Sequence, residues 1–308
     1  MKQRILAIII AGFCFLLAVG IILYPAISNY VNDRFQSVIQ TAYEENVAQT
    51  DDSKLREMLN NAAAYNLSIA PGTVSEDTYS RESLIHASQE YEDQLCVTAT
   101  GIMAYVEIPK IDVYLPIYHG TDSETLEKGI GHLLGSSLPV GGNTTHTVLT
   151  GHSGMASQTM FTDLHQLRAG DVIYIHVLQE TLAYEVSDVN TVLPHETELL
   201  EIRREEDLCT LVTCTPVGIN SHRLLVRGVR IPYEAAQEIE EIKADAPAEN
   251  DMETASWQEQ YIQGILWGIA AVLIVAISGA LISKIRNKKR RKRRKGGRYL
   301  CKKHSRLF

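Results

Sequence analysis

Two long apolar stretches without a charged residue, 5–24 and 261–283, constrain this chain more than any other feature. A helix rises about 1.5 Å per residue, so about 20 apolar residues cross a hydrocarbon core of roughly 30 Å. Each stretch therefore predicts a transmembrane helix. A cleaved signal peptide is the alternative for the first, although the run is long for a signal core and ends at Tyr24 and Pro25 without a small-residue cleavage site. A buried core helix is the alternative for the second.

Basic residues flank both stretches on the side facing away from the middle of the chain. Lys2 and Arg4 flank the start of the first, and positions 284–308 hold 14 of the 29 Lys and Arg residues and no acidic residue. The positive-inside rule places both flanks in the cytoplasm. The two stretches thus agree on one topology, a cell-membrane protein with its ends, 1–4 and 284–308, inside and residues 25–260 outside.

The basic tail would also fit a nucleic-acid-binding protein. Its position directly after an apolar stretch favours anionic lipid headgroups as its partner, and we expect no nucleic-acid partner. The net charge of −8 hides this division, because the segment 25–283 carries 13 basic residues against all 37 acidic ones. The sequence therefore predicts an acidic body with basic ends.

The segments next to the two apolar stretches differ in residue pattern from the middle of the chain. From 25 to 99 we expect a helical region, with helical spacing over 30–66, a turn-rich segment over 70–80 and a further short helix over 81–95. Residues 233–260 are acidic and rich in Ala and Glu. They predict a stalk between the central domain and the second apolar stretch.

The middle of the chain, residues 100–232, alternates short β-rich runs with Gly, Pro and Asn turns. Many short strands separated by such turns are typical of a closed or nearly closed β-barrel. One helix is expected to interrupt them between 157 and 167. The β-rich runs are 104–108, 113–119, 145–152, 171–178, 181–193, 208–214 and 222–231.

Cys214 and Arg223 stand where two β-rich runs meet the loop that joins them. A thiol at a strand end is accessible to a ligand, whereas Cys209, at odd spacing on the same run, faces the other way and is expected to be a small buried residue. Antiparallel pairing brings Arg223 beside Cys214, where a guanidinium group favours a thiolate and offers donors to an oxyanion. The structural alternatives are a packing cysteine and a surface arginine.

His152 ends another β-rich run, at a third strand–loop junction. His222 adjoins Arg223, but neighbouring strand residues point to opposite faces, so only one of these two can face the site. No CxxC, HxxxH, HExxH, Walker or GxGxxG motif is present, so neither a nucleotide site nor a zinc site is supported, and we assign no metal. The chain has ten histidines, and the following are expected to be ordinary polar residues: His119, His132, His146, His165, His176 and His195.

Three motifs, taken in order, resemble the sortase family: T-G-H-S-G at 150–154, T-L-V-T-C at 210–214 and H-R-L-L-V-R-G at 222–228. The resemblance covers about 100–232, and the layout of two spans with a helical N-terminal region is similar to class C, the pilin-polymerising sortases of Gram-positive bacteria. Further phrases similar to class C lie at 106–111, 115–120, 136–142, 161–164 and 214–228.

One departure concerns the lid that class C sortases carry before the barrel. That lid has an Asp-Pro-aromatic motif, and the corresponding stretch here, about 66–98, has no Asp-Pro pair. The lid is therefore either absent or anchored by other residues, such as Tyr79, and no lid residue is assigned.

The resemblance implies a mostly β protein, a closed eight-stranded sortase-type β-barrel with short helices, and a cysteine transpeptidase of the thiol protease class. Such an enzyme cuts an LPxTG-like sorting motif between Thr and Gly and joins the threonyl carbonyl to an amine. Cys214 would form a thioester, His152 would move protons, and Arg223 would hold the carbonyl or oxyanion. The implied partners are pilin subunits with C-terminal sorting signals, a pilin lysine as the nucleophile, and membrane lipid; no cofactor is implied.

Several alternatives stay open at this point. One is a housekeeping-type sortase that anchors surface proteins to a cell-wall precursor. Another is a catalytically silent scaffold for pilus assembly. A papain-like hydrolase is disfavoured because it would carry its cysteine on a helix. The three cysteines outside the membrane are an odd number, so at least one thiol is free, and a bridge between Cys96 and Cys209 is an open alternative.

Overall fold

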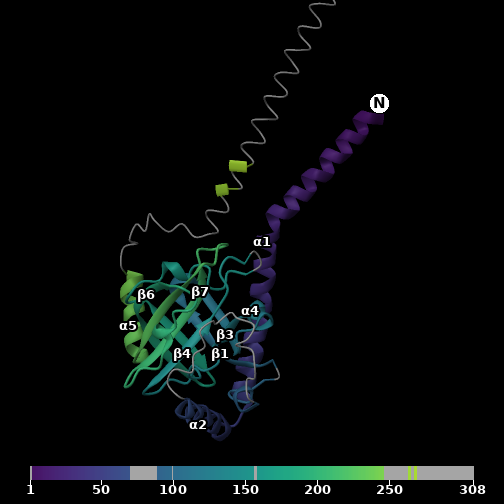
Figure 1. The fold of residues 1–308 in the computed structure, drawn as a ribbon. Helices are drawn as coiled ribbons and strands as arrows, with labels where there is room; N and C mark the ends of the chain where they lie inside the picture. The colour runs from purple at the N-terminus through teal and green to yellow at the C-terminus, as the bar shows by residue number, and fades with distance from the viewer. Residues whose placement is uncertain are drawn as a thin grey trace, which may run out of the picture. The chain divides into compact units, whose positions relative to one another are not determined.

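The computed structural model describes residues 2–69, 89–98, 100–155, 158–245, 263–264 and 267–268 (Figure 1). The chain divides into two units, Met1–Asp251 and Met252–Phe308. In the second unit the four described residues are helical. The second apolar stretch, apart from those four residues, and the basic tail lie outside the described residues.

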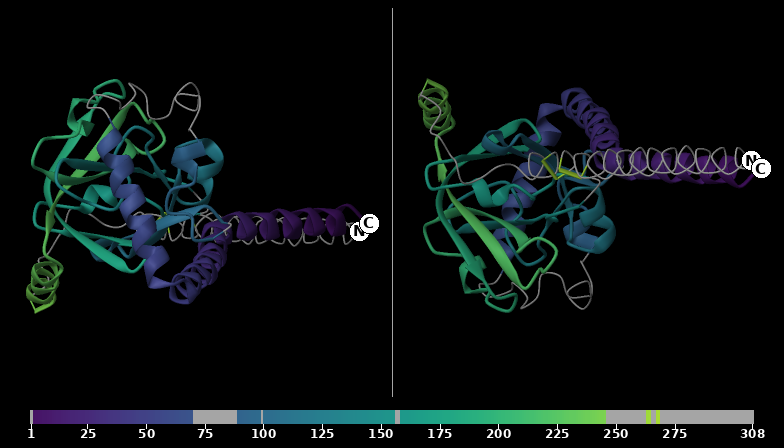
Figure 2. Two further views of the ribbon diagram at one scale, coloured as in Figure 1. Left: turned by 90° about the horizontal axis from the view of Figure 1, so that it is seen from below. Right: turned by 90° about the horizontal axis from the view of Figure 1, so that it is seen from above.

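Eight strands of the first unit close into a barrel in the order β1-β2-β3-β4-β7-β8-β6-β5. The pairs β2–β3 and β4–β7 are parallel and the others are antiparallel. Figure 2 shows the strands from below and from above the view of Figure 1. The expected eight-stranded barrel is thus confirmed. The strands are β1 Ile102–Ile108, β2 Val113–His119, β3 Ile130–His132, β4 Thr145–Thr150, β5 Val172–Val177, β6 Glu180–Val192, β7 Asp207–Thr215 and β8 His222–Ile231.

Apolar side chains fill the barrel interior. Period-two alternation turns every second residue of a strand inward, and the inward residues here are mostly β-branched or leucine. Burying one such side chain stabilises the fold by roughly 1.5–3 kcal/mol relative to leaving it in water. Fully buried members from six strands include Ile102, Ile117, Leu149, Ile173, Leu211 and Val226.

The prediction of a helix over 157–167 is wrong for the residues of that segment that the structure describes. The structure has turns there and a single 3₁₀ turn, η2 Leu164–Gln166. The backbone N–H of Phe161 donates to the carbonyl of His152 at 3.0 Å, which folds the segment back onto the end of β4. Met160 adopts a positive φ of 41°, which an α-helix does not allow. The helical spacing of apolar residues here reflects a buried turn.

The expected helical run over 30–66 forms two helices. The first, α1 Lys2–Gln49, contains the apolar stretch 5–24 and continues to the barrel, and the second is α2 Asp52–Ser68. The break between them is capped by Asp51, whose carboxylate accepts a hydrogen bond from the N–H of Ser53 at 2.8 Å. α2 lies across one end of the barrel (Figures 1 and 2).

Two buried polar side chains attach these helices to the barrel. Tyr43 near the end of α1 donates its hydroxyl to the carbonyl of Met103 at 3.3 Å and accepts the N–H of Leu178 at 3.0 Å. Asn66 near the end of α2 exchanges two hydrogen bonds with the backbone of Leu138, at 2.7 and 3.1 Å. The region before the barrel is therefore docked by specific contacts as well as by apolar packing.

Among the described residues, one helix is long and apolar enough to cross a membrane, judged by length and composition, namely Phe15–Gln49. This helix is consistent with the expected N-terminal anchor. The expected second span, 261–283, falls almost entirely outside the described residues.

The beginning of the expected stalk is a helix packed on the barrel. In α5 Tyr233–Asp245, Ala236 is fully buried against β5 and β6, and Glu240 accepts a hydrogen bond from Tyr174 at 3.0 Å. This part of 233–260 therefore belongs to the packed domain, because it has its own apolar contacts. Residues 246–260 lie outside the described residues.

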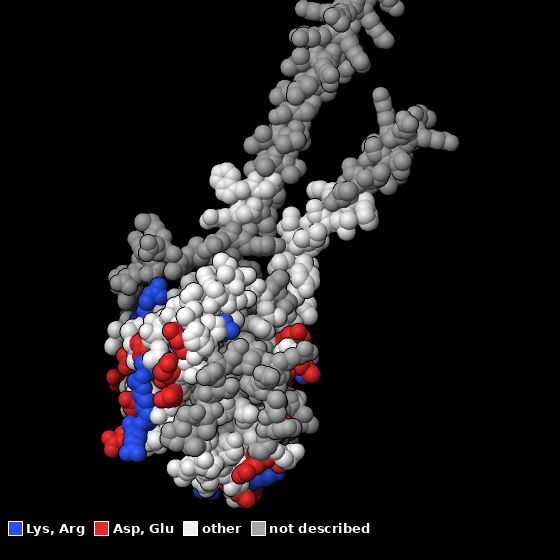
Figure 3. All heavy atoms as spheres, in the orientation of Figure 1, with Lys and Arg blue, Asp and Glu red and all other residues white. Residues whose placement is uncertain are grey.

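Acidic and basic side chains are mixed on the face seen in Figure 3.

Four shorter elements complete the described first unit, one of which is the 3₁₀ turn η3 Glu198–Leu200 in the β6–β7 loop. The helix α3 Gln89–Glu92 lies within the expected helix over 81–95, of which 81–88 is outside the described residues. The helix α4 Ser123–Lys128 and the 3₁₀ turn η1 Pro109–Ile111 were not expected.

Candidate active site

The sulfur of Cys214 and the guanidinium of Arg223 face the same side of the barrel wall. Cys214 pairs in register with Arg223 across the β7–β8 ladder. Directly opposed residues of an antiparallel pair project to one face, with Cβ atoms about 4.5–5.5 Å apart. The alternating residues Cys209 and Leu211 belong to the barrel interior, so Cys214 and Arg223 lie on the outer face. Both side chains are half-buried.

His152 is held beside Cys214 by the turn that follows β4. In the parallel β4–β7 ladder Thr150 pairs with Val212, and continuing this register by two residues sets His152 opposite Cys214. Three hydrogen bonds extend the pairing past the end of β4. They run from Gly151 N to Val212 O at 3.0 Å, from Thr213 Oγ1 to Gly151 O at 2.7 Å and from Ser153 Oγ to Cys214 O at 2.6 Å. The three side chains that the sequence singled out are therefore brought to one end of one face.

Two glycines make this turn possible. A Cβ atom on Gly151 would lie 2.7 Å from side-chain carbons of Ile130 and Phe161. Gly154 has a φ of +73°, and a Cβ atom there would overlap Cγ1 of Val217 in the β7–β8 loop. The glycines of T-G-H-S-G thus let the turn pack between β3 and the β7–β8 loop.

The charges around His152 and Arg223 define the chemistry that is possible. Partial burial lowers the pKa of His152 below its usual 6.5, and the carboxylate of Glu127 on α4 opposes this effect. The imidazole is therefore mostly neutral at pH 7 and able to accept a proton. Arg223 donates from Nη1 to the carbonyls of Asn220 and His222, both at 3.2 Å, which holds its cation at the base of the loop.

Two features near the site were missed by sequence reasoning. Val217 and Ile219 in the β7–β8 loop are 54% and 72% exposed, so apolar side chains border the site. The sequence did carry a signal for this apolar border, because two branched apolar residues in a short turn are unusual. The influence of Glu127 on His152 had no sequence signal, since it depends on where α4 packs.

Cys96 and Cys209, the other two cysteines whose side chains the structure describes, are free thiols. Cys209 is fully buried, as expected, and burial raises the pKa of its thiol well above the usual value. Cys96 is exposed, and neither forms a disulfide, so the alternative of a Cys96–Cys209 bridge is wrong.

Two histidines expected to be ordinary polar residues, His132 and His146, are buried parts of the framework. His146 contacts the carbonyl of Glu201 at 2.9 Å and the hydroxyl of Thr210 at 2.7 Å, which ties the β6–β7 loop to the outer face of β4 and β7. That loop contributes Leu200 to an apolar cluster with Val212, two residues before Cys214. His222 pairs with Thr215 in the ladder rather than with Cys214, as the strand alternation predicts.

In the part of the chain that the structure describes, no three His, Cys, Asp or Glu side chains converge so as to hold a metal ion.

Comparison with known proteins assigns the barrel to a family. A family model for the sortase domain matches residues 106–231. Sortase D of Bacillus subtilis (strain 168) is 33% identical over 136 residues, which cover 43% of this chain and 64% of that protein. Sortase A of Bacillus anthracis is 28% identical over 127 residues, covering 41% and 59%. The chain thus spans less than two thirds of the length of these two relatives.

Solved structures match over nearly their whole length. Sortase C of Streptococcus pneumoniae is 42% identical, with 63% of this chain and 96% of that chain covered and a TM-score of 0.57. The pilus-related sortase C of Group B Streptococcus is 38% identical, with coverage of 63% and 97% and the same TM-score of 0.57.

Proposed function

Because the chain belongs to the sortase family, we propose that it is a membrane-anchored cysteine transpeptidase that cleaves an LPxTG-like sorting motif between Thr and Gly and transfers the acyl group to a pilin lysine. The observation that carries this proposal is the alignment of Cys214 with Arg223 across β7–β8, with the His152 turn hydrogen-bonded to Cys214 itself.

The chemistry proceeds through a thioester. Neutral His152 takes the proton of the Cys214 thiol, and the thiolate attacks the threonyl carbonyl. Donors of Arg223 stabilise the oxyanion that forms, and such donors contribute most when they are already in place. The imidazolium then protonates the leaving glycine amine, the C–N bond breaks, and the threonyl group stays on sulfur.

The second half restores the enzyme. An incoming lysine amine attacks the thioester, and neutral His152 accepts its proton. The thiolate leaves, an amide bond joins threonine to lysine, and the proton on His152 returns to sulfur. The lowered pKa of His152 supports this cycle, since both halves begin with an imidazole that accepts a proton.

The choice of a pilin as substrate is supported by the class of the similar structures. Those of Streptococcus pneumoniae and Group B Streptococcus are described as acting on pilin substrates and as pilus-related, respectively. The N-terminal apolar helix supports anchoring at the membrane. We propose that the barrel lies outside the cytoplasm, where secreted pilins present their C-terminal signals, and that both ends of the chain are cytoplasmic.

Competition between nucleophiles tests the proposal. The full chain is mixed with an LPxTG-type peptide, a purified pilin domain and a mimic of the cell-wall precursor, and the ligated products are identified. We expect a threonyl–lysine amide with the pilin, loss of all ligation in C214A, and unchanged ligation in the matched control C96S. Ligation to the wall mimic alone would indicate the housekeeping type. Pilus fibres formed in cells carrying C214A would indicate the silent scaffold.

A further inference from the structure

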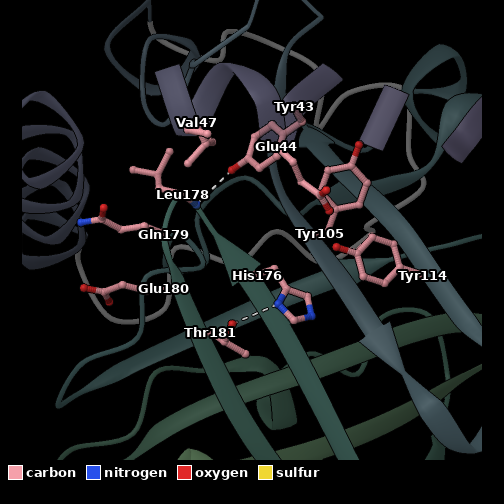
Figure 4. A pocket seen from close by; sticks show the side chains of 11 residues that line it. Tyr43, Glu44, Val47, Tyr105, Tyr114, His176, Leu178, Gln179, Glu180 and Thr181 are labelled. Atoms are coloured by element: carbon pink, nitrogen blue, oxygen red, sulfur yellow. Dashed lines mark hydrogen bonds between the residues drawn. The ribbon is translucent and has the colours of Figure 1, made fainter. Parts of the chain in front are cut away.

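A cavity of about 310 Å³ lies between the end of α1 and the outer face of the strands β1, β2, β5 and β6 (Figure 4). Tyr43 and Glu44 enter it from α1, Tyr105 and Tyr114 from β1 and β2, and His176 and Glu180 from β5 and β6. In the closed barrel β1 is four strands from β7 in either direction. The cavity is therefore separate from the site around Cys214.

A row of four rings forms one wall of this cavity. The ring centroids of Tyr43 and Tyr105 are 5.3 Å apart, those of Tyr105 and Tyr114 are 5.2 Å apart, and those of Tyr114 and His176 are 5.6 Å apart. Phenol rings carry partial negative charge on their faces and attract cations within about 6 Å of the centroid. A row of tyrosines is thus suited to a positively charged group with an apolar stem.

Acidic side chains add to this preference. Glu44 and Glu180 line the cavity, and none of its lining residues is a lysine or arginine. Glu107, which pairs with Tyr114 across the β1–β2 ladder, contacts His176 at 2.6 Å beside the ring wall. Burial, together with the carboxylates of Glu44 and Glu107, raises the pKa of Tyr114 to about 12. The negative potential of these two carboxylates therefore extends over the ring wall, and a cation bound there would partly neutralise this potential.

The wall offers oxygen atoms that can accept hydrogen bonds. Tyr105 is 1% exposed, and its hydroxyl group has no hydrogen-bond partner among the residues that the structure describes. Gln40 donates to Glu44 at 2.9 Å, which orients this carboxylate on the helix. An ammonium group carries three donors and no acceptor, so it complements phenol and carboxylate oxygens.

We propose that this cavity binds the ammonium group of a lysine side chain presented by a protein partner. The volume lies near the lower end of the roughly 300–1,000 Å³ of small-ligand pockets, which suits one side chain better than a large cofactor. The four-carbon stem would pack on Val47 and Leu178, which also line the cavity. The identity of the partner, a pilin subunit, rests on the proposed function, whereas the binding chemistry does not.

Binding of N-acetyl-lysine methylamide to the full chain in mild detergent tests the proposal, with the norleucine analogue as the uncharged control. The C214A background prevents turnover. We expect the lysine probe to bind and the norleucine probe not to bind. E44Q keeps the hydrogen bond from Gln40 and removes the charge, so it should weaken binding about 2–5-fold. E44Q combined with Tyr114→Leu should weaken binding about tenfold.

The matched control is E45Q, which makes the same charge change at the neighbouring residue of α1 outside the cavity, and it should leave binding unchanged. Equal binding of the norleucine probe, or equal effects of E44Q and E45Q, would overturn the proposal. With a pilin as acceptor, E44Q should raise KM and leave kcat unchanged, while transfer to a small amine should not change. Lysine binding without any acyl transfer would leave this inference standing and remove the proposed function.

Discussion

Replacing Gly154 by alanine should disturb the catalytic turn through two separable effects. The φ of +73° at Gly154 costs a residue with a Cβ atom about 1–2 kcal/mol. The new methyl group would also overlap Val217, so the turn or the β7–β8 loop must move. Movement of the turn would break the 2.6 Å hydrogen bond from Ser153 to Cys214, worth about 1 kcal/mol.

These terms add to about 2–3 kcal/mol, which reduces the population of the aligned turn by up to roughly 30–150-fold. We expect kcat/KM for transfer of an LPxTG-type peptide to fall by at least about tenfold in G154A, while the barrel stays folded. The assay pairs this rate with thermal unfolding, because a purely global loss of stability would lower the Tm without changing the rate of the folded enzyme.

A second substitution separates the two effects. V217A in the G154A background removes the overlap but not the unfavourable φ, so it should recover part of the lost activity. V217A alone should retain most of the wild-type rate. Wild-type kinetics in G154A would refute the view that this turn positions His152. Complete recovery in the double variant would refute the contribution of the backbone conformation.

Three further predictions concern charge. E127Q should shift the NMR titration of the His152 ring to lower pH, because the carboxylate of Glu127 raises the pKa of that group, and an unchanged midpoint would contradict their coupling. Arg223→Lys keeps the charge but loses the planar fork, so single-turnover thioester formation should slow by on the order of 10²–10³-fold, and a wild-type rate would exclude Arg223 as the oxyanion donor. Burial lowers the pKa of His132 from 6.5 to about 4, so the folded state binds fewer protons than the unfolded state below pH 6.5. Stability should therefore fall between about pH 6.5 and 4, by up to about 1.4 kcal/mol per pH unit from this group, as urea unfolding would measure, and a flat profile would contradict it.

Local patterns predicted most of the barrel but not its shortest parts. Seven β-rich runs correspond to seven strands within a few residues, because alternation and turn residues mark them directly. The strand β3, with three residues, is too short to show alternation and exists only because β2 and β4 pair with it. The segment 157–167 has helical spacing, yet its contact with the end of β4 makes it a turn, and that contact is not visible in local sequence.

Only part of the candidate site could be predicted from local sequence, because the rest depends on contacts between segments far apart in the chain. Cys214 and Arg223 flank one hairpin loop, so antiparallel geometry alone predicted their pairing. His152 lies about sixty residues earlier, and its place depends on the parallel β4–β7 ladder, which no local pattern indicates. Its assignment came from the resemblance to sortases. The cavity beneath α1 had no sequence signal, because its lining comes from segments far apart in the chain.

Mass spectrometry of the full chain, quenched during reaction with an LPxTG-type peptide, measures most directly whether sulfur, imidazole and guanidinium act together at the end of β7. We expect a mass increase equal to the threonyl fragment on the peptide that contains Cys214, and its loss in variants of His152 and Arg223. An adduct on the exposed Cys96, or ligation that continues in C214A, would contradict the proposal that these three groups act together at Cys214.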